Sequence, residues 1–285
     1  MGTVRVGLSG WSYDEWDGGF YPDDLPDGER LAFVAQRFAT VEVNGTFYSL
    51  TTPDAVRGWR DAAPSSFRFA VKGSRYITHM RRLDGVEGAL ANFFAAGVLD
   101  LGAMLGPVLW QLPDTLEFEG GLLDRFLDLL PADTEAARRL ARDHDDRVES
   151  PSFGPDENHR VRHVLEVRHD SWFCEEAVRI LRDHGVALAF SHATDWPYVE
   201  EVTAGFVYLR LHGPDEPYAS AYGEAVENWA DRIRRWHQAE EPDDAVRITD
   251  RAPPRRRERD VYVYFDNDVG GHAPRDARRL REVLG

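Results

Sequence analysis

The feature that most constrains the fold of this chain is a regular alternation between short apolar runs and segments of helical periodicity. Between the runs, apolar residues recur at helical spacing, as in Val226, Trp229 and Ile233. Short strands joined through helices pair in parallel with right-handed crossovers, and eight such units close into a barrel. The sequence therefore predicts an α/β fold, a (β/α)8 TIM-type barrel. Its eight strands are expected at Val4–Trp11, Thr40–Phe47, Arg68–Ser74, Pro107–Leu112, Arg162–His169, Ala187–Ala193, Phe206–Gly213 and Val261–Asp268.

The length of the chain suits one such barrel with additions. The chain has 285 residues, and barrels of roughly 250 residues are routinely single domains, so we expect one domain over residues 1–285. Two polar tracts, 132–159 and 240–260, look like insertions, the first with a short helix near residues 135–142. Neither tract has enough apolar surface to order itself strongly, so we expect both to be mobile surface loops. Residues 194–203 have the composition of a loop or short turn where the sixth helix is due.

The charge balance bears on the choice of partner. Fifty Asp and Glu against 34 Lys and Arg give a formal net charge of -16, and no basic run is long enough to act as a nucleic-acid arm. Non-specific DNA binding depends on clustered cations, so this balance disfavours a nucleic-acid partner without excluding a local cationic pocket. The triple arginine at residues 255–257 has acidic neighbours and is better explained as a solvated loop than as a phosphate contact.

Two further compositional features concern location and chemistry. The first ten residues lead directly into a strand pattern, and the single cysteine, Cys174, cannot form an internal disulfide. We therefore expect no signal peptide, no membrane span and a cytoplasmic location. Lys72 is the only lysine beside 33 arginines. It is either a chance survivor or a position where a compact ammonium is needed and a planar guanidinium does not fit.

Polar side chains late in the strands point to a site. Active sites of TIM barrels lie at the carboxyl ends of the strands, and residues two apart in a strand share a face. Interior charges are costly unless paired, so a cluster of them indicates function, or else a salt-bridge network that only fills the barrel. We predict Glu42, Lys72, Glu166 and His212 as catalytic residues. The predicted substrate-binding residues are Trp11, Tyr13, Asn44, His79, Gln111, Arg168, His169, Arg210, Asp266, Asn267 and Gly270.

These residue types predict the following roles. Lys72, Arg168 and Arg210 would hold negative charge, Glu42 and Glu166 are acid/base candidates, and His212 would transfer a proton. Lys72 could instead form a Schiff base if neighbouring cations lower its pKa.

Two loops add weaker signals. The glycine-rich loop around Gly270 follows the last strand, the usual phosphate-binding position of this fold, although its glycines could simply be turn residues. The first loop is rich in aromatic residues, including Trp11 and Tyr13, and could stack a sugar or a base or only plug the barrel rim.

A divalent metal site is the competing interpretation. Its ligands would come from Glu42, His79, Glu166, His169, His212 and Asp266. No dense ligand spacing supports it, and the interleaved cations would repel a metal, so we expect an anion-binding centre. No cofactor is predicted, and a divalent metal stays open.

Several stretches together resemble the YecE-like family, catalogued as domain of unknown function seventy-two. They are Gly7–Tyr13 with Phe20–Pro22, Val41–Tyr48, Phe69–Lys72 with Ile77–His79, Trp110–Pro113, Glu166–Trp172, Tyr208–Gly213 and Tyr262–Asp268. The resemblance covers nearly the whole chain and implies a TIM-type barrel. Asp266 stands where the family leads us to expect asparagine, and the two insertions look longer than is typical. Likeness of such barrels to endonuclease IV-like and sugar-isomerase-like barrels is an analogy of fold only.

Three hypotheses of function follow. The leading one is an enzyme acting on a small anionic ligand, phosphorylated or sugar-like, at the carboxyl ends of the strands. The second is a metal-dependent phosphodiesterase acting on nucleic acid through Glu42, Glu166, His212 and Asp266. The third is a metabolite-binding module without catalysis.

Overall fold

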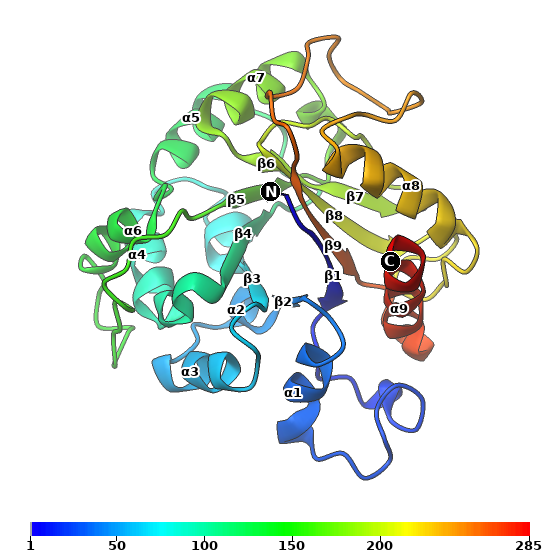
Figure 1. Ribbon diagram of the computed structural model, residues 1–285. Coiled ribbons are helices and arrows are strands. Elements are labelled where there is room, and N and C mark those ends of the chain that lie inside the picture. The colour runs from blue at the N-terminus through cyan, green and yellow to red at the C-terminus, as the bar shows by residue number, and fades with distance from the viewer. Residues whose placement is uncertain (1) are drawn as a thin grey trace. The chain divides into compact units, whose positions relative to one another are not determined.

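The fold is a TIM-type α/β barrel built on nine parallel strands, in a computed structural model that describes residues 2–285 (Figure 1). Every run that we predicted as a strand overlaps a strand, and two strands begin before their predicted runs, at Leu105 and Asp260. The sixth run contains two, because the pairing breaks at Ala189 between β6 and β7. The strands are β1 (Val4–Ser9), β2 (Thr40–Val43), β3 (Arg68–Lys72), β4 (Leu105–Gln111), β5 (His163–Glu166), β6 (Ala187–Leu188), β7 (Phe190–Ala193), β8 (Phe206–Gly213) and β9 (Asp260–Phe265).

Helices follow most strands, as the periodicity predicted. They are α1 (Arg30–Ala35), α2 (Gly45–Tyr48), α3 (Pro53–Asp61), α4 (Glu87–Ala95), α5 (Gly120–Asp128), α6 (Thr134–Ala141), α7 (Glu175–His184), α8 (Ala225–His237) and α9 (His272–Leu284). Short turns of 3-10 or π-helix are η1 (Asp14–Trp16), η2 (Asp27–Glu29), η3 (Tyr76–Met80), η4 (Val98–Met104), η5 (Asp170–Trp172) and η6 (Val269–Gly271). Helix α3 begins as its sequence predicts, with Pro53 in the first turn and the Thr52 hydroxyl accepting from the Ala55 N–H. Residues 194–203 form no helix, as their composition predicted.

The chain divides into two compact units, and each is described separately. Unit 1 comprises residues 1–42 and 173–285, and unit 2 comprises residues 43–172. In unit 1, β1 lies between β2 and β9, and β8 lies between β9 and β7. Figure 1 shows α8 and α9 beside these strands, where they pack on each other. The apolar side chains of β1, β8 and β9 pack with those of the two helices in one core.

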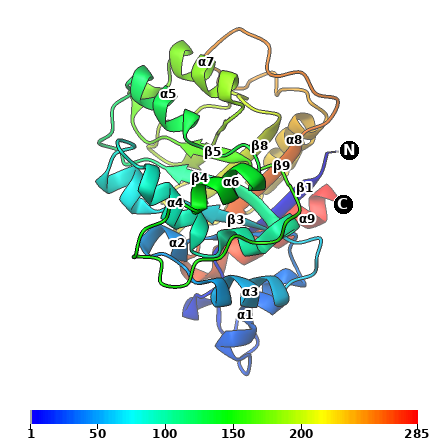
Figure 2. The same cartoon turned by 90° about the vertical axis from the view of Figure 1, so that its left-hand side faces the viewer.

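Unit 2 is built on β3, β4 and β5 in that order. Helix α6 lies in the tract 132–159 and packs on α4, with Ala137 and Ala141 fully buried; Figure 2 shows both helices on the side facing the viewer. The Asn92 amide donates to the Asp145 carboxylate at 3.0 Å and accepts from its N–H at 2.9 Å. The short helix predicted in this tract is therefore present, and it carries more apolar packing than its composition indicated.

The tract 240–260 contains neither helix nor strand before β9 begins at Asp260. Its middle is fixed by the fully buried Glu201, which accepts from the N–H groups of Ile248 at 2.8 Å and Thr249 at 3.0 Å. Hydrogen bonds to a buried carboxylate, rather than the packing of an apolar face, thus order this tract. Across residues 2–285, none of the helices combines the length and apolar character needed to cross a membrane.

Candidate active site

Several buried polar and charged side chains of unit 1 lie around Arg210, a residue of β8. Its Nε and Nη2 donate to the two carboxylate oxygens of Glu42, at 3.0 and 2.7 Å, in a bidentate pair. Nη2 also lies 2.9 Å from Oδ2 of Asp266. Both Arg210 and Glu42 are buried, so desolvation makes this pairing necessary. We call Ser9, Glu42, Tyr208, Arg210, His212 and Asp266 the Arg210 cluster.

Two hydroxyl groups complete the shell around Glu42. Ser9 donates to Oε1 at 2.7 Å, and Tyr208 donates to Oε2 at 2.6 Å. Both carboxylate oxygens are thus occupied by donors. Glu42, predicted as an acid/base residue, is in this geometry the counter-ion of Arg210, and its catalytic role stays a prediction.

His212 has a defined tautomer in this cluster. Its Nε2 lies 3.3 Å from Nη1 of Arg210, which can only donate, so Nε2 is the acceptor. The proton then sits on Nδ1, which lies 2.9 Å from Oδ2 of Asp266. Ser191 Oγ lies 3.1 Å from the same Nε2. The His212 ring is fully buried, with Arg210 near one ring nitrogen and the Asp266 carboxylate near the other.

Asp268 is a carboxylate whose pKa departs far from that of an ordinary aspartate. Burial, followed by the charge of Asp266, raises the pKa of Asp268 to about 9, against the lowering effects of Tyr13 and Arg210. Its Oδ1 is buried without a hydrogen-bond partner among residues 2–285, an arrangement that a neutral acid tolerates better than an anion. Asp266 and Asp268 therefore form a pair in which one member holds a proton at neutral pH.

Tyr13, in the aromatic loop after β1, lies next to this pair. The Tyr13 hydroxyl donates to the Ser9 carbonyl at 2.6 Å, and its ring lies 4.5 Å from that of Trp16. Burial and the charges of Asp268 and Asp266 raise the pKa of Tyr13 well above its usual range, so the phenol stays protonated. Trp11 is partly buried, and its carbonyl accepts from the Tyr21 hydroxyl at 2.6 Å. Tyr13 thus lies at the acid pair, while Trp11 contributes a backbone contact.

Asn267 and Gly270 make internal contacts in unit 1. The Asn267 side-chain nitrogen donates to the Ser220 carbonyl at 2.9 Å and to Asp276 at 2.8 Å. Gly270 has a φ of 65°, which explains a glycine there, and its N–H donates to Glu15 at 3.2 Å. A carboxylate of the protein therefore takes the N–H that we predicted for a ligand anion.

Unit 2 brings Lys72, His79 and Phe47 together. The Lys72 ammonium lies 4.6 Å from the centre of the Phe47 ring, and the His79 ring lies 5.1 Å from the same ring, edge on. His79 Nδ1 contacts the Thr78 hydroxyl at 2.9 Å. Burial, with smaller contributions from Lys72 and Arg75, lowers the pKa of His79. The positive charges of Lys72 and Arg75 therefore act on the His79 ring.

The other predicted residues of unit 2 follow β2, β4 and β5. Arg168 donates to Glu166 at 2.7 Å, and the Glu166 side chain is fully buried. Gln111 ends β4 in register with Glu166. His169 Nδ1 contacts the Ser171 hydroxyl at 2.9 Å, and Asn44 directly follows β2. In residues 2–285 we find no group of three or more His, Cys, Asp or Glu side chains placed to hold a metal ion.

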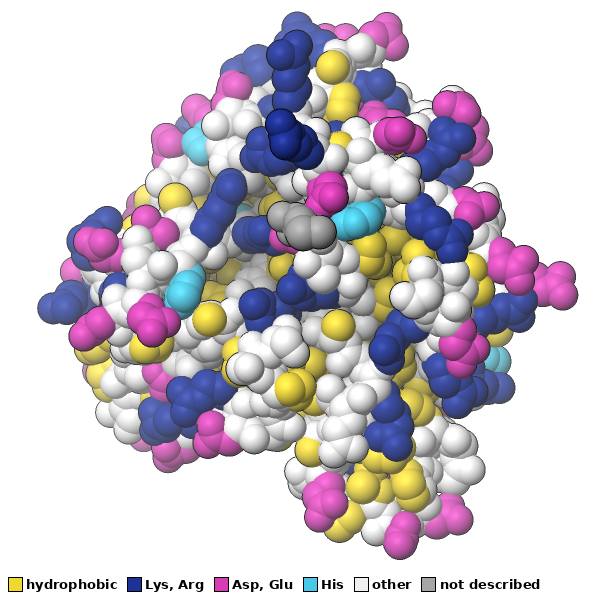
Figure 3. All heavy atoms as spheres, viewed as in Figure 1, with side chains coloured by type: hydrophobic (Ala, Val, Ile, Leu, Met, Phe, Trp, Pro, Cys, Tyr) yellow, Lys and Arg dark blue, Asp and Glu magenta, His cyan; other side chains and the backbone are white. Residues whose placement is uncertain are grey.

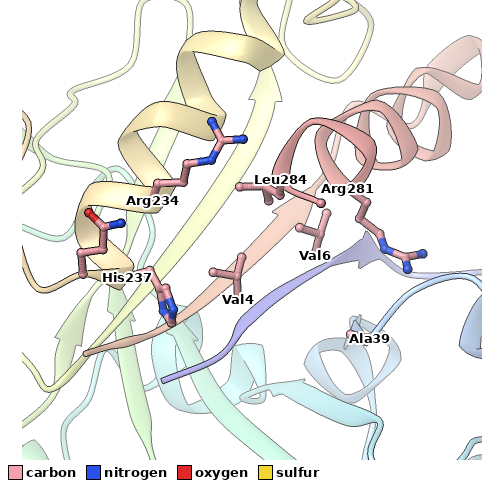
Figure 4. A pocket seen from close by; sticks show the side chains of 9 residues that line it. Val4, Val6, Ala39, Arg234, His237, Arg281 and Leu284 are labelled. Atoms are coloured by element: carbon pink, nitrogen blue, oxygen red, sulfur yellow. The ribbon is translucent and has the colours of Figure 1, made fainter. Parts of the chain in front are cut away.

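A pocket of about 430 Å³ lies in unit 1 near the start of β1 (Figure 4). Its side chains tie elements together: Arg234 contacts the Val283 carbonyl, His237 Nδ1 contacts the Arg259 carbonyl at 2.9 Å, and Arg281 lies 5.8 Å from the Phe38 ring. Amino-terminal ends of TIM-barrel strands serve stability, so we do not count this pocket as the functional site.

Sequence reasoning left some residues out of the predicted site. Asp268 was not selected, because its raised pKa depends on burial and on Asp266, which the sequence does not show. Ser9 and Tyr208 were missed as partners of Glu42, since hydroxyl groups carry no charge signal in a sequence. The spacing of Arg210 and His212, two residues apart, did correctly place both in one cluster.

Comparison with known proteins assigns this barrel to a family. The family described as "Protein of unknown function DUF72" matches residues 5–285. The chain belongs to the DUF72 family. A DUF72 relative, the UPF0759 protein YecE of Escherichia coli (strain K12), is 27% identical over 255 residues, which cover 84% of each chain. The UPF0759 protein YunF of Bacillus subtilis (strain 168) is 21% identical over an alignment of 302 residues, covering 99% of this chain and 94% of YunF.

A DUF72 family protein from Thermotoga maritima has a similar crystal structure. The TM-score is 0.73 at 23% identity, with 99% of each chain covered. The resemblance seen in the motifs and the predicted barrel are both confirmed. Because the description of DUF72 assigns no function, the chemistry has to be argued from the site itself.

Proposed function

We propose that this DUF72 protein is an enzyme that binds a small anionic ligand and uses Asp268 as the acid that donates a proton to it. The observation that carries the proposal is the burial of Asp268 Oδ1 without a hydrogen-bond partner among residues 2–285, and this burial, with the charge of Asp266, raises the pKa of Asp268 to about 9. A carboxylic acid that keeps its proton at neutral pH is what general acid catalysis requires, and pairs of carboxylates with separated pKa values recur in acid–base enzymes.

The Arg210 cluster supports this role for Asp268. Arg210 neutralises Glu42 and contacts Asp266, so it offsets the negative charge next to the acid pair. His212, whose Nδ1 lies 2.9 Å from Oδ2 of Asp266, is proposed to return a proton to the pair. Arg210 is therefore proposed as a positioning residue, and Asp268 as the catalytic acid.

Unit 2, taken by itself, also carries positive charge. Lys72 and Arg75 lower the pKa of His79, after the larger effect of burial and against the charge of Asp114. A phosphate or carboxylate is the natural complement of such a field. The metal-dependent alternative would instead require Glu42 and Asp266 to exchange their contacts with Arg210 for a cation.

The proposal is tested with a panel of sugar phosphates and small carboxylates. Binding is followed by calorimetry, and turnover by NMR of the ligand. For a ligand that is turned over, Asp268→Asn should lower kcat by roughly 100-fold or more while the Kd changes little, because the amide keeps the shape but cannot donate the same proton. The matched control is Asp215→Asn, at an exposed carboxylate of the same unit.

Each outcome bears on the proposal. Full turnover in Asp268→Asn overturns the role of the acid. Tight binding without any product overturns the enzyme and favours a metabolite-binding module. If no anion of the panel binds, the anionic ligand class is wrong. Activity that disappears with a chelator and returns with a divalent metal would favour the phosphodiesterase hypothesis.

A further inference from the structure

A pocket of about 350 Å³ in unit 2 has a mostly apolar wall. Its lining includes Tyr48, Leu50, Ser74, Tyr76, Ala89 and Arg147. Tyr48 is 70% exposed and Tyr76 40% exposed, and both are among the few large hydrophobic side chains that lie open on this protein. Two exposed aromatic rings seldom line one pocket in contact with water. Their flat faces can stack on a ligand.

The walls of this pocket are held in place from three directions. Tyr48 ends α2, and its ring packs edge on against Phe47 at 5.1 Å. Tyr76 begins the π-helical turn η3, where its N–H donates to the Ser74 hydroxyl at 3.2 Å. Arg147 comes from the tract 132–159 and pairs with Asp145 at 3.5 Å. Each of these lining residues thus has a contact within the protein, and short π-helical turns often mark functional positions.

Cationic side chains of unit 2 lie close to this pocket along the chain, since Arg75 stands between the lining residues Ser74 and Tyr76. The Phe47 ring that supports Tyr48 also contacts His79 at 5.1 Å and lies 4.6 Å from the Lys72 ammonium. Tyr76 and His79 belong to the same turn, η3, and the exposed Arg75 directly precedes it. The buried Phe47 ring therefore contacts Tyr48, which lines the pocket, as well as His79 and the Lys72 ammonium.

We propose that this pocket and the neighbouring cations of unit 2 bind a phosphate that carries an aromatic base, as in a nucleoside monophosphate. The inference rests on the anionic ligand class of the proposed function and concerns unit 2 alone. A ring stacked on Tyr48 and Tyr76 buries apolar surface that the free protein leaves in water, while Lys72 and Arg75 complement the phosphate. A sugar phosphate alone would leave both tyrosines exposed.

The test compares one whole ligand with its two halves. Calorimetry measures the Kd of adenosine monophosphate, ribose 5-phosphate and adenosine on the full chain. We expect adenosine monophosphate to bind at least about tenfold more tightly than ribose 5-phosphate. Tyr48→Ala should weaken adenosine monophosphate by about tenfold or more and leave ribose 5-phosphate unchanged. The matched control is Met80→Ala, which removes another exposed apolar side chain, 65% exposed, from η3, the turn that also holds Tyr76.

The possible results separate this inference from the proposed function. Equal Kd values for adenosine monophosphate and ribose 5-phosphate, with no effect of Tyr48→Ala, overturn the ring pocket but leave the anion site standing. Adenosine binding as tightly as the monophosphate supports the ring pocket and counts against the anionic ligand. Failure of all three probes to bind overturns both. An equal loss in Met80→Ala would show a general disturbance of η3 and would also overturn the specific role of Tyr48.

Discussion

At the scale of single residues, Asp268 predicts a dependence of stability on pH. Its pKa is about 9 in the folded chain, against the usual value of 3.8, so the folded state holds an extra proton between these values. The contribution of Asp268 to stability is therefore retained at low pH and lost as pH rises toward 9. The free energy of unfolding of Asp268→Asn, relative to that of the natural chain, should therefore rise by about 1 to 3 kcal/mol from pH 5 to pH 8.5. Chemical denaturation at the two pH values measures this change.

The comparison with Asp215→Asn controls this measurement. Asp215 is exposed in the same unit, so its substitution should shift stability by a similar small amount at both pH values. If the difference in the free energy of unfolding between Asp268→Asn and the natural chain stays constant from pH 5 to pH 8.5, Asp268 is an ordinary carboxylate. That result would also overturn its role as the catalytic acid.

Individual residues also show where sequence reasoning stops. The charges of Glu42, Arg210 and Asp266 and their places late in strands were sufficient to predict a polar cluster. The bidentate pairing of Arg210 with Glu42 was not predictable, because it depends on which strands are neighbours and on the burial of both groups. The same holds for the exposure of Tyr48 and Tyr76, since an aromatic residue in a sequence is more often part of a core.

At the scale of elements, the buried carboxylate of Asp276 joins α9 to the loop before α8 and to the end of β9. Oδ2 accepts from the Tyr222 N–H at 2.8 Å and from the Asn267 side chain at 2.8 Å, and Oδ1 accepts from the Gly223 N–H at 3.3 Å. Asp276→Ala leaves these donors without their acceptor, so it should lower the free energy of unfolding by about 2 to 4 kcal/mol. Denaturant titration measures the loss.

A surface aspartate on a neighbouring helix provides the control. Asp231 in α8 is 75% exposed and pairs with Arg234 at 2.8 Å, so Asp231→Ala should cost less than about 1 kcal/mol. If both substitutions have the same small effect, the contacts of Asp276 do not hold these elements together. In that case Asn267, freed from a structural role, would return as the ligand-binding residue predicted from the sequence.

The elements themselves were the most predictable level of the structure. Apolar runs located all the strands because a strand of this fold is buried on both faces and needs a continuous apolar segment. The break at Ala189 was missed, since the run Ala187–Ala193 is uninterrupted in composition and the break is one of pairing. Helix α6 shows the converse, because two small alanines suffice to pack it on α4.

At the scale of the whole molecule, net charge opposes binding to nucleic acid. The formal net charge is -16, and Figure 3 shows acidic and basic side chains intermixed over the face in view. Affinity for a DNA duplex comes largely from the release of counterions by clustered cations, and an intermixed surface releases few. The exposed run of Arg255, Arg256 and Arg257 is the strongest local exception, with Glu258 beside it.

This charge distribution predicts that a mixed-sequence DNA duplex binds with a Kd weaker than about 10⁻⁴ M at 150 mM salt, as measured by fluorescence anisotropy. Replacing Arg255, Arg256 and Arg257 with glutamine should then change nothing, because there is no phosphate contact to lose. Tight binding whose logarithm falls steeply with the logarithm of salt, and which the triple substitution abolishes, would contradict this prediction. It would also move the ligand class from a small anion to the phosphate backbone itself, since only that polymer engages several arginines at once.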